Sequence, residues 1–291
     1  MPAPLRICYL NGNYLALAEA RVSPLDRAFL FGDSVYEVLP VYASRPFRLR
    51  EHLDRLNRSL AGIGMPPPLP HAEWARLCEE LIARNSAGDA YLYLQVTRGA
   101  EFGRNHAWPE GLKPTLFAYA TPLERASPSI LEQGVSAVTA ADTRWARRDI
   151  KSTALLANVL LKKLSADAGA FETIMLENGE LTEGSSTTVH VVNQGVIRTP
   201  PNGHHILPGT TRDVVTELAA RLGVRCDSSR VTENELRGAD EIWLAFATRG
   251  VLPVTTLDGV AVGTGKPGPL FKRMSAAFAD YTRELAGTPV L

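Results

Sequence analysis

The sequence predicts an α+β fold built from two domains. Its 291 residues are enough for two ordinary domains, each with a core of its own. Strand-like runs are mixed with helical segments, without the regular alternation that a parallel α/β sheet requires. A polar stretch at 121–128 is bracketed by prolines, which is typical of a linker. We therefore predict a smaller N-terminal α/β domain at 1–120 and a larger, β-rich C-terminal domain at 129–291.

Composition excludes several classes of protein. Hydrophobic residues make up 45% of the chain, charged residues 21%, and the formal net charge is zero, so neither nucleic acid nor a membrane is an expected partner. No basic N-terminal region precedes an apolar run, so we expect neither a signal peptide nor a transmembrane span. Cys8, Cys78 and Cys226 are too few and too scattered for a disulfide framework or a metal site. A cytoplasmic location is the simplest expectation.

The N-terminal half predicts a hairpin, two helices and three strands. Asn11-Gly12 favours the positive φ angles of a tight turn, so the flanking runs form the hairpin. Apolar residues at every third or fourth position, followed by Gly64, indicate the first helix. The expected elements are a hairpin at 7–17, a strand at 35–42, helices at 52–63 and 72–84, and strands at 90–97 and 115–120.

The C-terminal half is richer in strands. Thr210 is a plausible cap of one helix, and Thr232-x-x-Glu235 is a capping-box pattern that opens a short one. The expected elements are a strand at 135–141, a helix at 154–167, hairpin-linked strands at 173–177 and 180–193, a helix at 211–222, strands at 241–246 and 251–256, and a terminal helix along 270–285.

The segment 147–152 and the helix after it organise the rest of the chain. Apolar side chains repeat at helical spacing, which predicts a helix packed into the core with Lys151 at its mouth. They are Leu155, Leu156, Val159, Leu160 and Leu164. A lysine beside two arginines is usually solvated. The downstream stretches 181–187 and 207–213 favour a functional lysine instead, because they carry groups that could bind the same cofactor as Lys151.

Three groups would together hold a pyridine cofactor. A Schiff-base lysine, a carboxylate facing the ring nitrogen and backbone amides at a helix start for the phosphate are supplied by Lys151, Glu183 and 209–211. In this order, the motifs resemble the fold-type IV pyridoxal-phosphate enzymes, over about 9–254. That family includes the D-amino-acid and branched-chain transaminases and aminodeoxychorismate lyase. The resemblance implies pyridoxal 5'-phosphate as cofactor and a barrel-like C-terminal domain.

The resemblance also implies the cofactor contacts, although each residue has a plainer alternative. Arg55 of His52-x-x-Arg55-Leu56 holds the phosphate in the family, whereas an arginine opposite an apolar stripe is normally solvated. Glu183 would otherwise be a turn carboxylate. The further cofactor residues implied are Ser186, Leu207 against the ring, Thr210 and Thr211 at the phosphate, and Thr248, where the family threonine aligns with Ala247.

Substrate choice is expected to depend on Tyr36, Arg104 and His106. D-amino-acid transaminases carry an Arg-x-His carboxylate trap in this loop, which here is about one residue longer. The trap reaches the neighbouring subunit's site in the family, so the resemblance implies a homodimer.

The implied reaction moves the amino group of a D-amino acid, such as D-alanine or D-glutamate, to 2-oxoglutarate or pyruvate, with Lys151 as Schiff base and proton carrier. A branched-chain L-aminotransferase, aminodeoxychorismate lyase and a non-catalytic pyridoxal-phosphate-binding protein are the alternatives.

Overall fold

The computed structural model describes residues 5–286, and their contacts divide the chain into two compact units. The first unit comprises 5–124, Ile150–Ala154 and 282–286; the second comprises Arg125–Asp149 and Leu155–Tyr281. The chain thus returns to the first unit for five residues, which include Lys151. The predicted linker at 121–128 overlaps the end of a strand, which continues to Pro122.

The first unit contains a six-stranded sheet in the order β2-β1-β6-β5-β3-β4, with antiparallel neighbours throughout. Its strands are β1 (Ile7–Leu10), β2 (Asn13–Ala16), β3 (Ser34–Tyr42), β4 (Arg45–Pro46), β5 (Ala90–Thr97) and β6 (Thr115–Pro122). Its helices are the short 3-10 turn η1 (Leu17–Glu19), α1 (Arg27–Phe31), α2 (Leu49–Gly62) and α3 (His71–Arg84). The predicted hairpin is confirmed, with Asn11 and Gly12 at φ 49° and 93°.

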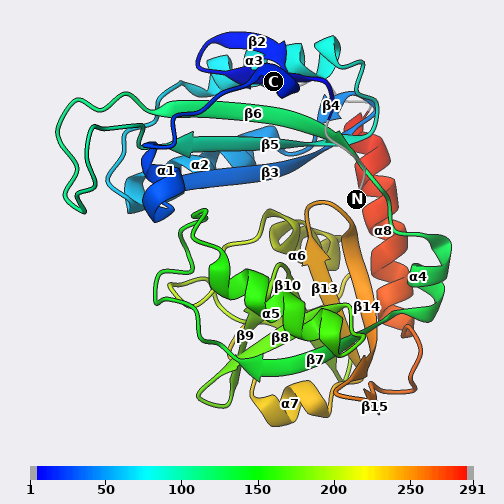
Figure 1. The fold of residues 1–291 in the computed structure, drawn as a ribbon. Coiled ribbons are helices and arrows are strands. Elements are labelled where there is room, and N and C mark those ends of the chain that lie inside the picture. The colour runs from blue at the N-terminus through cyan, green and yellow to red at the C-terminus, as the bar shows by residue number, and fades with distance from the viewer. Residues whose placement is uncertain (1–4, 287–291) are drawn as a thin grey trace. The chain divides into compact units, whose positions relative to one another are not determined.

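One face of this sheet is covered by α2 and α3 (Figure 1). The other face carries stacked tyrosines, among them Tyr36 and Tyr93. Strand alternation explains the difference, because successive side chains point to opposite faces. On β5, Leu92 and Leu94 are fully buried and join the core with Leu53 and Leu56 of α2. Tyr93, between the two leucines, is half-buried on the opposite face.

The second unit contains a nine-stranded sheet in the order β12-β11-β10-β13-β14-β7-β8-β9, with β15 beside β14. The strands are β7 (Val135–Ala141), β8 (Glu172–Glu177), β9 (Glu180–Gly184), β10 (Thr188–Asn193), β11 (Val196–Thr199), β12 (Cys226–Ser228), β13 (Glu241–Phe246), β14 (Gly250–Leu257) and β15 (Val260–Ala261). Although β9 and β10 are separated by four strands in this order, they contact each other. The sheet therefore curls, which confirms the expected barrel-like, β-rich unit and the α+β class.

Five helices accompany this sheet: α4 (Pro128–Gln133), α5 (Leu156–Asp167), α6 (Thr210–Arg221), α7 (Glu233–Arg237) and α8 (Pro269–Ala286). The capping box of α7 is confirmed, since Thr232 Oγ1 accepts from the Glu235 amide and the Glu235 carboxylate accepts from the Thr232 amide. Buried Glu241 accepts from the first amides of α8, at Leu270 and Phe271. A carboxylate on β13 thus accepts hydrogen bonds from the free backbone amides at the N-terminus of α8.

The prediction that α5 packs its apolar stripe into the core is wrong. The helix lies on β7 and β8 (Figure 1), but it buries only Leu161 and Ser165. Most of the stripe is exposed instead: Leu156 by 70%, Val159 by 60%, Leu160 by 61% and Leu164 by 43%, while Leu155 is half-buried. Periodicity correctly identified an amphipathic helix, but it does not say which surface covers the apolar side.

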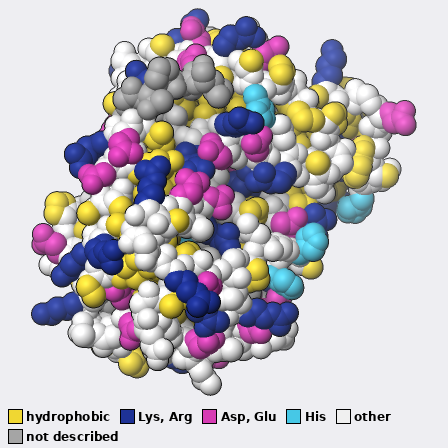
Figure 2. Space-filling view, turned by 180° about the vertical axis from the view of Figure 1, so that it is seen from behind, with side chains coloured by type: hydrophobic (Ala, Val, Ile, Leu, Met, Phe, Trp, Pro, Cys, Tyr) yellow, Lys and Arg dark blue, Asp and Glu magenta, His cyan; other side chains and the backbone are white. Residues whose placement is uncertain are grey.

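The surface agrees with the neutral composition. On the face shown in Figure 2, basic and acidic side chains are interspersed, without a field of one sign. Across residues 5–286, no helix combines the length and the apolar character needed to cross a membrane. Cys8 and Cys78 are buried free thiols, and Cys226 is a half-buried one.

Candidate active site

Lys151 is fixed by backbone contacts on both sides. Its carbonyl oxygen accepts from the Tyr36 amide at 3.0 Å, and its own amide donates to Ser59 Oγ at 3.1 Å. The next residue, Ser152, forms a β-bridge with Val35 at the start of β3. The Lys151 amine lies 4.2 Å from the centre of the Tyr36 ring. The structure thus brings together two of the predicted site residues, with Lys151 held beside Tyr36 at the start of β3.

Arg55 is held by a buried carboxylate. Its Nε and Nη2 donate to the two oxygens of Glu37 at 2.7 and 2.8 Å, and His52 Nδ1 lies 2.9 Å from the same carboxylate. Arg55 is 4% exposed, so the solvated alternative is wrong. Burial alone would raise the pKa of Glu37, but the charge and hydrogen bonds of Arg55 outweigh it and hold that pKa well below its usual range. The fork fixes the guanidinium plane.

His52 is part of the same buried cluster, but burial favours its neutral form, whereas Arg55 keeps Glu37 charged. Burial lowers the pKa of His52 because the charged imidazolium loses its hydration, and the neighbouring charges of Arg55 and Lys151 act in the same direction. Glu37 opposes this shift without reversing it. A neutral His52 can donate through Nδ1 to Glu37 and so orient the carboxylate toward Arg55.

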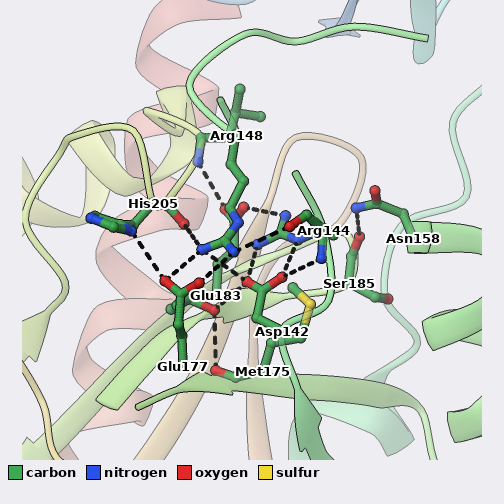
Figure 3. A network of polar contacts seen from close by, with 11 residues as sticks. Asp142, Arg144, Arg148, Asn158, Met175, Glu177, Glu183, Ser185 and His205 are labelled. Atoms are coloured by element: carbon green, nitrogen blue, oxygen red, sulfur yellow. Dashed lines mark hydrogen bonds and ion pairs between the residues drawn. The ribbon is translucent and has the colours of Figure 1, made fainter. Parts of the chain in front are cut away.

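Glu183 lies at one end of a chain of ion pairs in the second unit (Figure 3). Arg144 donates from Nη1 to Glu183 Oε1 at 2.5 Å and from Nη2 to Asp142 Oδ2 at 2.7 Å. Asp142 also faces Arg148 Nη1 at 3.5 Å. Arg148 in turn forks onto Glu177 at 2.8 and 3.0 Å. Carboxylates and arginines alternate along this chain, so each buried charge faces an opposite one.

The surroundings of Glu183 shift its pKa in two opposite directions. Its burial raises its pKa, because a carboxylate loses hydration, while the charge and hydrogen bond of Arg144 lower it. The Leu207 amide also donates to Oε2, at 3.1 Å. The net result is a raised pKa, so the ionised form of Glu183 depends on Arg144. This contact also fixes the backbone of Leu207, the residue predicted to pack on the cofactor ring.

The start of α6 has the features of an anion site. Gly209, not the predicted Thr210, is the N-cap, and no side chain caps the helix. A Cβ on Gly209 would come within 2.6 Å of Thr188 Oγ1, so this position admits no side chain. The first-turn amides at Thr210 and Thr211 therefore have no side-chain cap and lie at the positive end of the helix dipole. Uncapped amides suit a phosphate. Taken unit by unit, the carboxylate of Glu183 suits a protonated ring nitrogen and the amine of Lys151 suits an aldehyde, so the chemistry of these residues is compatible with pyridoxal 5'-phosphate.

Ser186 and Thr248 lie in turns at one edge of the curled sheet. Thr188 pairs with Ala245, so the turn before β10 and the turn after β13 are neighbours. The first turn carries Ser186, whose exposed hydroxyl donates to the buried Glu172 at 3.1 Å. Thr248 is half-buried in the second turn. A cofactor contact from either residue stays a prediction.

Arg104 and His106 are exposed in the loop after β5. Both side chains contact the ring of Phe31: the Arg104 guanidinium carbon is 5.0 Å from its centre, and the His106 ring centre is 5.4 Å away. The loop therefore presents the two predicted carboxylate-binding groups side by side.

Sequence reasoning missed the groups that control the site charges. Glu37 occupies an inward position of β3 between Val35 and Leu39, which is a signal that a buried charge needs a partner. Arg144 gave no comparable signal in the sequence. Its carboxylate partners, Asp142 and Glu183, lie at the ends of two different strands, β7 and β9. Among the described residues, no group of three or more histidine, cysteine and acidic side chains could hold a metal ion.

Comparisons with known proteins agree with this chemistry. The family model Amino-transferase class IV matches residues 34–257. The chain is 42% identical to the D-alanine aminotransferase of Bacillus licheniformis over 270 residues, covering 93% of this chain and 95% of the relative.

Two solved structures are similar throughout. The Escherichia coli branched-chain amino acid aminotransferase has a TM-score of 0.89 at 29% identity, covering 95% of this chain and 94% of the other. The branched-chain amino acid aminotransferase of Thermoproteus uzoniensis with norvaline has a TM-score of 0.85 at 26% identity, covering 97% and 95%. With most of its length matched by the family model, the chain belongs to the class IV aminotransferases.

Proposed function

We propose that this protein is a pyridoxal-phosphate-dependent D-amino-acid transaminase, which moves the amino group of a D-amino acid such as D-alanine or D-glutamate to 2-oxoglutarate or pyruvate. The likeness to D-alanine aminotransferase over nearly the whole chain is the observation that carries this assignment. The Arg104-x-His106 pair on Phe31 supports it, because it offers a carboxylate both charge and a directional donor.

Bound pyridoxal phosphate supplies an electron sink for the pair left when the α-proton departs. Lys151 would hold the cofactor through its amine, and with that amine free, Nζ would be the base that accepts the α-proton of the substrate and gives it back. Ionised Glu183 would keep the pyridine nitrogen protonated. Arg55 and the amides of Thr210 and Thr211 would hold the phosphate, with Thr248 as a further contact.

The substrate carboxylate is bound by Tyr36, Arg104 and His106, with the loop coming from a second copy of the chain. Exposure of the α5 stripe supports a homodimer, because an apolar helix face of this size is costly to leave in water. The free thiols suit a reducing compartment, and we place the protein in the cytoplasm.

The main alternative is branched-chain L-amino-acid transamination, which the similar solved structures support through their names. Half-reaction spectra of the purified holoenzyme against D- and L-amino acids, with chiral analysis of the product, separate the two. We expect conversion of the cofactor by D-alanine and D-glutamate. Conversion by L-leucine alone would assign the alternative, and release of pyruvate from aminodeoxychorismate without an amino acceptor would assign the lyase.

Replacing Lys151 by alanine should remove the absorption of the lysine-bound cofactor and abolish transamination, because no other amine replaces Nζ at that position. Far-UV circular dichroism should stay unchanged, since Lys151 is held through its backbone. Lys163→Ala is the matched control, because Lys163 is an exposed lysine paired with Asp167. Normal absorption and turnover in Lys151→Ala would identify it as the wrong lysine.

Replacing Arg144 by methionine should move the acid limb of the pH–rate profile to higher pH. The variant loses the charge that lowers the pKa of Glu183, so this pKa rises further and the active carboxylate forms only in more alkaline solution. Arg147→Met is the control, because Arg147 pairs with Asp149 instead. Glu183→Gln should be slow at every pH, and an unshifted limb in Arg144→Met would contradict the role given to Arg144.

Replacing Arg104 by alanine should lower kcat/KM for D-alanine by at least about tenfold, since a desolvated charge-assisted contact is worth on the order of 2 kcal/mol. Ethylamine, the decarboxylated counterpart, lacks the group that Arg104 binds, so its turnover should change much less. Arg76→Ala, an exposed arginine on α3, is the control. An equal loss for the two substrates would refute the trap and the case for D-selectivity.

Replacing Leu160 by glutamate should convert the dimer to a monomer and reduce D-alanine turnover, because a charge enters the apolar stripe and the partner's loop is lost. Light scattering measures the mass. Val260→Glu is the control, since Val260 is 69% exposed on β15 and Leu160 is 61% exposed on α5. A Leu160→Glu variant that keeps the dimer mass would remove α5 from the interface.

A further inference from the structure

Arg27 connects the short helix α1 to the loop that carries Arg104 and His106. The Arg27 side chain is only 3% exposed. Its Nη1 donates to the Asn105 carbonyl oxygen at 2.7 Å and its Nη2 to the His106 carbonyl oxygen at 3.0 Å. The Arg27 amide donates to the Gly99 carbonyl oxygen at 2.9 Å, so this one residue holds the loop at its root and near its tip.

Carboxylates hold the Arg27 guanidinium in this orientation. Its Nε donates to Asp33 at 2.8 Å, and Nη1 also pairs with Glu101 in the loop itself. Burial alone would raise the pKa of Asp33, but hydrogen bonds from Arg98 and Arg27 outweigh it and lower that pKa. All three guanidinium nitrogens are thus engaged in a fixed plane, an arrangement that the single ammonium of lysine cannot reproduce.

Phe31, at the other end of α1, supports the side chains of the same loop. Its ring centre is 4.7 Å from the Arg27 guanidinium carbon and 5.0 Å from that of Arg104. The His106 ring is 5.4 Å away. Arg27 therefore fixes the loop backbone while Phe31 receives its two functional side chains, and both belong to one five-residue helix.

We propose that Arg27 is a positioning residue for carboxylate recognition: it holds the loop carbonyls at 105 and 106 so that Arg104 and His106 are presented together on Phe31. This inference rests on the proposed function, because it requires that Arg104 bind the substrate carboxylate. Arg27 touches no substrate. Its contribution is preorganisation, since a loop that is ordered before binding loses less conformational freedom when the substrate arrives.

The test uses the Arg27→Lys holoenzyme, which retains the positive charge but loses the fork. We expect KM for D-alanine to rise at least about tenfold, while kcat/KM for ethylamine changes by less than about twofold. The affinity for propanoate, a carboxylate without an amine, should fall by a similar factor when it is measured through the change in cofactor absorbance. The absorption of the lysine-bound cofactor should stay as in the unmodified protein.

Two variants separate positioning from folding. Arg198→Lys is the matched control, because Arg198 also pairs with a carboxylate, Glu235, and donates to a backbone carbonyl oxygen, that of Arg230, but both partners lie in the second unit. It should leave propanoate affinity within about threefold. Phe31→Leu keeps an apolar side chain and should reproduce the selective loss of Arg27→Lys without removing a charge. If Arg27→Lys is poorly folded, Phe31→Leu alone still tests whether support of the loop by α1 is needed for carboxylate binding.

A double-mutant cycle with Arg104→Ala tests whether Arg27 affects the use of D-alanine through Arg104. If Arg27 acts through the trap, Arg27→Lys/Arg104→Ala should use D-alanine about as well as Arg104→Ala alone. Additive losses, or equal losses for D-alanine and ethylamine in Arg27→Lys, would overturn the positioning role. If Arg104→Ala is selective and Arg27→Lys is not, only this inference fails; if Arg104→Ala is itself unselective, the trap and the inference fail together.

Discussion

A buried carboxylate facing an arginine fork is the interaction on which the candidate site depends. Glu37 is fully buried, and an unpaired charge there would cost several kcal/mol, roughly the stability margin of a small domain. Arg55 and His52 remove that cost by hydrogen bonding to it. The requirement also operates in reverse, because the carboxylate fixes a guanidinium that would otherwise move freely on the surface of α2. Charge pairing thus supplies both stability and geometry.

The same requirement has a different outcome at Glu183. Glu37 has a bidentate partner and a lowered pKa, whereas Glu183 shares Arg144 with Asp142 and keeps a raised one. A carboxylate that is incompletely compensated has a free-energy reason to attract one more positive group, such as a protonated ring nitrogen. Glu37 is already satisfied and has no such tendency. Both carboxylates are buried, and the number of arginine contacts distinguishes a structural ion pair from a group suited to a cationic ring.

Much of the fold could be predicted from local sequence, because turns and strands are encoded by neighbours. Asn11-Gly12 specified its hairpin, and β5 and β7 have the bounds that the sequence predicts. The site motifs named Lys151 and Glu183, whose roles toward a cofactor stay predictions. The predictions that failed depended on residues far away in the sequence. The helix α5 was expected in the core because periodicity identifies an apolar side of a helix but not the surface that covers it. Arg144 was overlooked because its importance lies in a contact with a residue 39 positions away.

Burial also separates the groups assigned to chemistry from those assigned to specificity. Glu37, Arg55 and Glu183 are nearly inaccessible and tied into ion pairs, so a substitution there leaves a buried charge without its partner. Arg104 and His106 are exposed, and their side chains rest on the ring of Phe31. Changing them costs the fold little, because no buried charge depends on them. A loop anchored through backbone carbonyls by Arg27 can therefore exchange its side chains while keeping its position. If the proposed roles hold, substrate recognition has a freedom that the buried residues proposed to bind the cofactor lack.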